Sequence, residues 1–124
     1  MKKLLLACMM MLAGSAWSEW VRYAESEEAT FYFDPATIRK EGNMRRVWAI
    51  QDLRKPDKVG GEMSVRLRNE YDCKNERSRT LGLSTHSEPM AGGTVLELGG
   101  EKQNWRAIAP ESVNETIFNL VCAK

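Results

Sequence analysis

The sequence has few of the residues on which most enzyme and nucleic-acid sites depend. It is 124 residues long, enough for one domain, and it contains one His and three Cys. A single imidazole excludes most zinc sites and most histidine-based acid–base mechanisms. No nucleophile elbow, phosphate-binding loop or dinucleotide fingerprint occurs. The formal net charge of +1 argues against a strongly basic surface. We therefore expect no catalytic residue, no metal, no cofactor and no nucleic-acid partner.

Acidic residues are absent before Glu19, and the segment that precedes it has the order of a bacterial signal peptide. Two lysines are followed by an uncharged apolar run over residues 4–13 and then by small residues. Ala16 and Ser18 make a small-x-small pattern, so we predict cleavage between Ser18 and Glu19, with cleavage after Ala16 as the alternative. A transmembrane helix needs about 20 apolar residues, so we expect no integral membrane segment once the signal is removed.

Cys8 lies inside this apolar run and raises the question of a lipid anchor. Residues 5–8 loosely resemble a lipoprotein cleavage box, but the apolar run continues beyond Cys8, whereas a lipid-bearing Cys normally closes it. We therefore expect no lipid at Cys8. Residues 1–18 are assigned to a signal peptide and residues 19–124 to one exported domain, in the periplasm or on the outer surface of the envelope. Without the two lysines of the signal, 16 basic residues remain against 17 acidic ones, a net charge of −1.

Two cysteines, Cys73 and Cys122, remain in the exported chain. An even number of cysteines in a protein that leaves the cytoplasm predicts one disulfide. A metal site is the alternative, but two isolated cysteines and one distant His are a poor ligand set. A redox site would need a Cys-x-x-Cys pair, which the sequence lacks.

Most of the exported chain is predicted to form strands. The clearest one covers residues 63–73, where apolar and polar side chains alternate and Cys73 falls on the apolar face. Residues 45–53 carry apolar side chains on both faces, which predicts a strand covered on both sides. Further extended segments are predicted at residues 20–24, 30–33, 76–85, 94–98 and 105–108. Asp34 is predicted to cap a helical turn over residues 35–38.

The end of the chain changes to a helical period. Residues 110–112 predict the start of a helix. Its core-facing stripe is predicted to comprise Val113, Ile117, Leu120 and Val121. A helix of about 12 residues is marginal alone in water, so a bond from Cys122 to the strand that ends at Cys73 would hold it in place. The predicted fold class is α+β: an antiparallel sheet of about six strands with one C-terminal helix packed on a face, tied by a disulfide.

A basic and aromatic surface is the candidate binding site. Its residues are Arg66, Arg68, Arg77, Arg79 and Trp48. The functional interpretation is contact with acidic protein surfaces or sulfated glycans. The alternative is a solvated strand face whose arginines pair with neighbouring acids, namely Glu70, Asp72 and Glu76. If Trp48 lies on the face opposite the helix, a second copy of the chain is one way to cover it, which predicts a homodimer.

His86 is the only histidine, and hydroxyl residues flank it. One interpretation is a general base beside a hydroxyl in a small hydrolase. The interpretation we favour is an exposed histidine at the edge of a loop.

Seven short segments occur in a characteristic order and spacing. They are Glu19-Trp20-Val21, residues 32–39, Val47-Trp48, residues 70–73, Trp105, residues 108–110 and Val121-Cys122. Together they resemble the bacterial surface-adhesin protein E family. The resemblance implies an antiparallel sheet whose C-terminal helix is fastened by a disulfide, and a dimer. It also implies an envelope protein that binds host matrix or serum proteins such as laminin, vitronectin and plasminogen.

The sequence departs from this family in one respect. The founding adhesin is a lipoprotein, whereas Cys8 does not close a lipid-attachment box here. The alternative function is therefore a periplasmic structural or regulatory module that binds another envelope protein.

The exported protein is predicted to begin at Glu19 and to carry one disulfide. Expression of the full chain in a bacterium, followed by intact-mass spectrometry of the exported fraction, should give the mass of residues 19–124 less two hydrogens. Cleavage after Ala16 would add the mass of two residues. Retention of residues 1–18, or two free thiols in the exported protein, would contradict this prediction.

Overall fold

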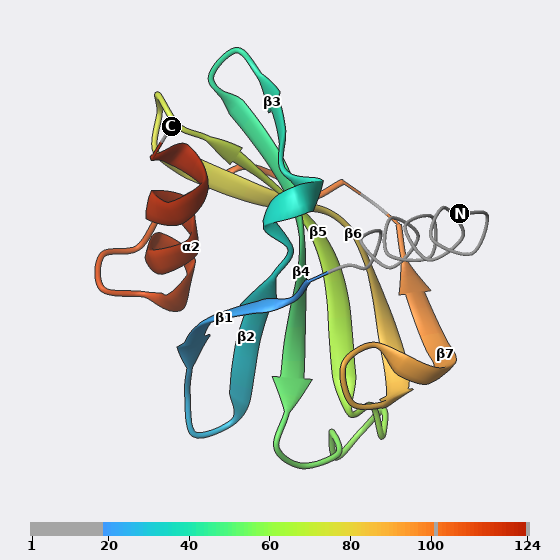
Figure 1. The fold of residues 1–124 in the computed structure, drawn as a ribbon. Coiled ribbons are helices and arrows are strands. Elements are labelled where there is room, and N and C mark those ends of the chain that lie inside the picture. Colours follow the sequence, from blue (N-terminus) through green and yellow to red (C-terminus); the bar gives the residue numbers. More distant parts are fainter. Residues whose placement is uncertain (1–18, 101, 124) are drawn as a thin grey trace, which may run out of the picture.

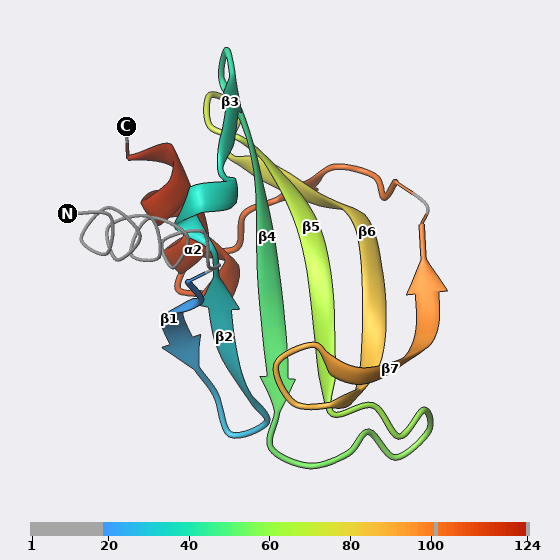
Figure 2. The same cartoon turned by 45° about the vertical axis from the view of Figure 1, so that its right-hand side comes forward.

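Antiparallel strands build one curled sheet (Figure 1). The computed structural model describes residues 19–100 and 102–123. Six strands lie side by side in chain order: β1 (Val21–Glu25), β2 (Ala29–Phe33), β4 (Met44–Leu53), β5 (Ser64–Asp72), β6 (Arg77–Glu88) and β7 (Gly92–Gly99). Two short strands join off this path, where β3 (Arg39–Glu41) pairs with β4 and β8 (Arg106–Ala107) pairs with β6. In Figure 2, β4, β5 and β6 form the middle of the sheet and β7 its outer edge.

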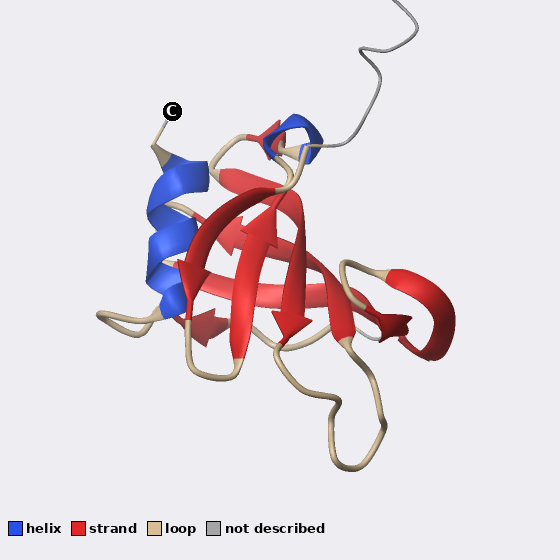
Figure 3. Cartoon of the chain, turned by 60° about the horizontal axis from the view of Figure 1, so that its bottom comes forward, coloured by secondary structure: helices blue, strands red, loops and turns tan. Residues whose placement is uncertain are grey.

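The C-terminal helix α2 (Val113–Cys122) packs on one side of this sheet (Figure 3). The core between them consists of Phe33, Val47, Ala49, Tyr71, Ile117, Phe118 and Val121. Side chains along a strand point alternately to its two faces. Val47 and Ala49 are two residues apart on β4, so both point to the core. The predicted fold class, an antiparallel sheet with one C-terminal helix tied by a disulfide, is confirmed.

Two details of the predicted helix are wrong. The helix begins at Val113 rather than at residue 110, because Glu111 has a φ of +59°, which is left-handed and cannot continue into a helix. Ser112 is the N-cap instead, and its hydroxyl accepts the N–H of Glu115 at 3.1 Å. Leu120 is not in the core, since 49% of it is exposed. Phe118, which is 8% exposed, fills the core beside Ile117 and Val121.

The disulfide joins the end of β5 to the end of α2. Cys73 and Cys122 are bonded, and their Cα atoms lie 5.7 Å apart. A ten-residue helix has little stability of its own, so this bond keeps its apolar side against the sheet. The predicted pairing of the two cysteines is therefore present.

A short helical turn precedes the middle of the sheet and positions β4. Asp34 caps the 3₁₀ turn Pro35–Thr37 by accepting the N–H of Ala36 at 3.0 Å, as predicted. The hydroxyl of Thr37 accepts the backbone N–H of Trp48 at 3.1 Å. This bond ties the turn to β4 at Trp48.

Asp72 organises the turn that connects β5 to β6. Its carboxylate is 1% exposed and accepts both the backbone N–H of Asn75 at 3.2 Å and the side-chain amide of Asn75 at 2.9 Å. The Nε of Arg77 donates to it at 2.9 Å. The bonds from Asn75, joined by Arg77, lower the pKa of Asp72 from 3.8 to about 2.

The predicted signal peptide, its cleavage after Ser18 and the question of Cys8 all concern residues outside those described, apart from Glu19. Over residues 19–100 and 102–123, no helix is both long and apolar enough to cross a membrane.

Removing the disulfide is expected to weaken the fold substantially. The bond closes a separation of 49 residues, for which the loss of unfolded-chain entropy corresponds to about 4 kcal/mol. The double variant Cys73→Ser with Cys122→Ser should lose about that amount of unfolding free energy, out of the roughly 5–15 kcal/mol typical of a domain. Urea unfolding followed by tryptophan fluorescence measures it. A loss below about 1 kcal/mol would show that packing alone holds α2 on the sheet.

Asp72 is expected to make stability fall at acid pH. Its pKa is lower in the folded chain than in the unfolded chain, so its contribution is complete above about pH 4 and disappears as the pH falls towards 2. Asp72→Asn should therefore be less stable than the native chain at neutral pH, and the difference should shrink on acidification. Urea midpoints measured over this pH range provide the test, and a difference that does not change with pH would contradict it.

Candidate functional site

All five predicted site residues lie on the face of the sheet that α2 does not cover. In the strand register Trp48 is opposite Arg68, Glu70 is opposite Arg79, and Asp72 is opposite Arg77. These positions alternate with the core residues of the same strands. The structure thus brings together one strand residue from β4 and two arginines from each of β5 and β6.

Trp48, Arg66 and Arg68 form one unit of this face, which we call the Trp48 platform. The guanidinium carbon of Arg66 lies 4.2 Å from the centroid of the Trp48 ring, and that of Arg68 lies 6.0 Å away. Both distances fit cation–π attraction. Both arginines are exposed, and neither forms an ion pair with another described residue. The platform therefore presents two uncompensated positive charges beside an aromatic ring.

Arg77 and Arg79 form a different unit, in which the charge is neutralised. The Nε of Arg77 is 2.9 Å from the carboxylate of Asp72, and a terminal guanidinium nitrogen of Arg79 is 2.7 Å from that of Glu70. Both guanidinium groups also lie over the ring of Trp105, at 4.5 Å and 4.1 Å from its centroid. These contacts hold the 102–108 segment against β6. The alternative prediction of cross-strand pairs thus describes Arg77 and Arg79.

The acids of this unit are buried. The predicted cross-strand pairs are present, but the prediction that they lie on a solvated strand face is wrong. Glu70 is 2% exposed and Asp72 is 1% exposed. Burial alone would raise the pKa of Glu70, but the hydrogen bonds from Arg46 and Arg79 outweigh it and hold that pKa below its usual value. Glu70 is therefore ionised and shared by two arginines.

His86 is buried, so the interpretation of an exposed histidine at a loop edge is wrong. It is 5% exposed because β6 continues to Glu88 and encloses it within the sheet. Its Nε2 lies 2.7 Å from the hydroxyl of Ser84, while Nδ1 has no hydrogen-bond partner among the described residues. Burial, with the charge of Arg66 adding to it, lowers the pKa of His86. The ring is therefore neutral at neutral pH.

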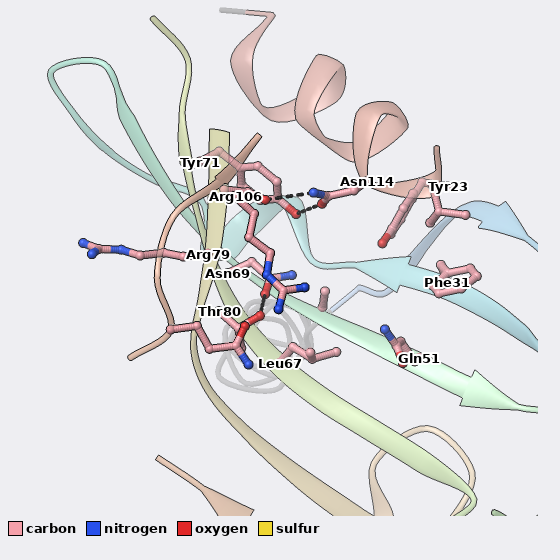
Figure 4. A pocket seen from close by; sticks show the side chains of 14 residues that line it. Tyr23, Phe31, Gln51, Leu67, Asn69, Tyr71, Arg79, Thr80, Arg106 and Asn114 are labelled. Atoms are coloured by element: carbon pink, nitrogen blue, oxygen red, sulfur yellow. Dashed lines mark hydrogen bonds between the residues drawn. The ribbon is translucent and has the colours of Figure 1, made fainter. Parts of the chain in front are cut away.

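The opposite face of the sheet contains a cavity of about 280 Å³ beside the N-terminal end of α2. Figure 4 shows the hydroxyl of Tyr23, the amide of Gln51 and the guanidinium of Arg106 directed into this space. The sequence analysis did not identify this site. One signal was present, because Gln51 is a polar residue in phase with Val47 and Ala49, which belong to the core.

A hydrogen-bonded chain forms one wall of the cavity. The hydroxyl of Tyr71 donates to Asn114 at 3.2 Å, and the amide of Asn114 donates to Ser78 at 2.8 Å. Burial raises the pKa of Tyr23 to about 12 and also raises the pKa of Tyr71. Both phenols are therefore neutral hydrogen-bond donors at neutral pH.

Within the described residues, no group of three or more His, Cys, Asp or Glu side chains is arranged to hold a metal ion.

Comparison with known proteins gives a family match by sequence and a fold match by structure. The sequence model of the family described as surface-adhesin protein E matches residues 20–123. A crystal structure of Haemophilus influenzae protein E (crystal form II) superimposes with a TM-score of 0.68 at 16% identity, over 88% of this chain and 91% of that chain. Another structure of protein E, from non-typeable Haemophilus influenzae, gives 0.59 at 17% identity, over 88% and 78%.

These structural matches establish a shared fold, while the sequence match establishes the family. A search of curated proteins finds no significant match. Because the family match covers nearly all of the described residues, the chain belongs to the surface-adhesin protein E family.

Proposed function

We propose that the chain is an exported, non-enzymatic binding domain that attaches to proteins through the Trp48 platform. The family is one of surface adhesins. The observation that supports a site at this place is that Arg66 and Arg68 are exposed, lie on Trp48 and have no acidic partner among the described residues. By the family resemblance, the proposed partners are host matrix or serum proteins such as laminin, vitronectin and plasminogen.

The chemistry of the platform favours acidic segments of a partner protein. The N–H groups of a guanidinium lie in the plane of the guanidinium itself. When that plane stacks on an aromatic ring, the N–H groups point outward from the stack and can donate in pairs to a carboxylate. The two arginines are two residues apart on β5, so both project from the same face. Tryptophan and arginine are also the residue types that contribute most to protein interfaces.

The neighbouring unit of Arg77, Arg79 and Trp105 is not expected to compete for the partner. Arg77 and Arg79 are already paired with Asp72 and Glu70. They are therefore expected to hold the surface in shape, while Arg66 and Arg68 carry the attraction. The proposed binding site therefore comprises three of the five predicted residues, namely Trp48, Arg66 and Arg68.

The double variant Arg66→Gln with Arg68→Gln is expected to bind laminin, vitronectin or plasminogen about tenfold or more weakly than the native chain, since two charged contacts are lost. Surface plasmon resonance with each immobilised protein gives the affinity. Binding by the native chain should also weaken as salt rises, because the attraction is between exposed charges.

The matched control is Lys40→Gln with Lys58→Gln, which removes the same charge from two exposed positions. Equal losses in both double variants would show that net charge, and not the platform, controls binding.

Sedimentation of the same proteins tests the proposed homodimer, which the platform variant should weaken if a second copy covers Trp48. Retention in the periplasm with capture of another envelope protein would instead support the alternative function.

A further inference from the structure

The cavity on the helix side of the sheet has free donors and no acidic lining. Among its described lining residues there is no Asp or Glu. Arg106 forms no ion pair with another described residue. The side chains of Tyr23 and Gln51 form no hydrogen bond with another described residue. Arg79 also lines the cavity, but Figure 4 shows its side chain pointing away, and Glu70 on the other face neutralises it. The space is therefore electropositive.

Three backbone attachments fix the donors around this space. β8 pairs with β6 so that Arg106 lies opposite Ser78, on the cavity side. The backbone N–H of Gln103 donates to the carbonyl of Thr80 at 2.9 Å, which holds the preceding segment on the same strand. Gln51 lies opposite Phe31 in the register of β4 and β2. Arg106 thus sits at the exposed mouth, and Gln51 sits on the strand that forms the floor.

The remaining lining is apolar and aromatic. The rings of Tyr23 and Phe31 lie 6.2 Å apart on neighbouring strands. Leu67 and Ala49 complete the apolar part of the lining. The volume of about 280 Å³ is just below the range of small-molecule sites, which span roughly 300–1,000 Å³. An occupant of this site therefore has a small ring or short aliphatic body and an acceptor group at one end.

We propose that this cavity is a binding site for a small organic carboxylate, whose carboxylate contacts Arg106, Tyr23 and Gln51 and whose apolar body lies against Phe31 and Leu67. A carboxylate offers two acceptor oxygens to a guanidinium and to neutral N–H and O–H donors. The neutral phenol of Tyr23, which forms no hydrogen bond with another described residue, donates to it without repelling its charge. This inference goes beyond the proposed function, because the cavity and the Trp48 platform are on opposite faces of the sheet.

Phenylacetate and its uncharged analogue phenylacetamide are suitable probes. Titration of the isotope-labelled exported chain with phenylacetate should give saturable shifts in the amide NMR signals of Tyr23, Gln51 and Thr80, with a dissociation constant of about 1 mM or lower. Phenylacetamide should bind about tenfold more weakly, because it lacks the charge. Arg106→Gln should remove this preference, and Tyr23→Phe should weaken phenylacetate more than phenylacetamide, because the hydrogen bond to the charged acceptor is the stronger one.

Lys102→Gln is the matched control, since it removes an exposed cation four residues away that does not line the cavity. It should leave the preference intact. A peptide ending in phenylalanine with a free carboxylate distinguishes the two sources of this chemistry. If it binds as well as phenylacetate, the site takes the end of a protein chain. If only phenylacetate binds, the site takes a free small acid.

Three results would overturn the inference. They are the absence of shifts at cavity residues, equal binding of the acid and the amide, and equal effects of Arg106→Gln and Lys102→Gln. Each is independent of the binding experiments on Arg66 and Arg68.

Discussion

The attachment of α2 to the sheet is the constraint on which the rest of this structure depends. The helix has only ten residues, and its buried side chains reach the sheet at Ile117, Phe118 and Val121. The bond between Cys73 and Cys122 fixes its far end to β5. With the helix in place, one face of the sheet is partly covered and the other is open to partners. The same attachment forms one wall of the cavity, because Asn114 on α2 accepts a hydrogen bond from Tyr71 on β5.

Charge on the open face is distributed so that few arginines remain free. Glu70 is shared by Arg46 and Arg79, and Asp72 holds Arg77. Burying these two acids would be costly without such partners, so the arginines around them have a structural task. Arg66 and Arg68 have no such task among the described contacts, and they therefore define the part of the face that is free to bind.

The sequence was sufficient for the fold class, the disulfide and the faces of the central strands, because alternation and cysteine count are local signals. It was not sufficient where tertiary contacts decide. Glu111 adopts a left-handed φ that no helix signal reveals, so the sequence pattern predicts a helix start that is too early. β6 extends to Glu88 through pairing with β7, so His86 is buried where the local sequence pattern predicts an exposed residue. The cavity depends on Arg106, Gln51 and Tyr23, which come from three distant segments that only the folded sheet brings together.

Two adjacent residues show how this chain serves two surfaces with one short extended segment at the start of β8. Trp105 lies under Arg77 and Arg79 on the open face, while Arg106 points into the cavity on the helix face. Because side chains alternate along extended backbone, a slip of one residue would exchange them and remove both arrangements. The solved protein E chains share this fold at only 15–17% identity. A fold supports many functions, so what this chain binds has to be inferred from its own arginines and aromatic rings rather than from its strands.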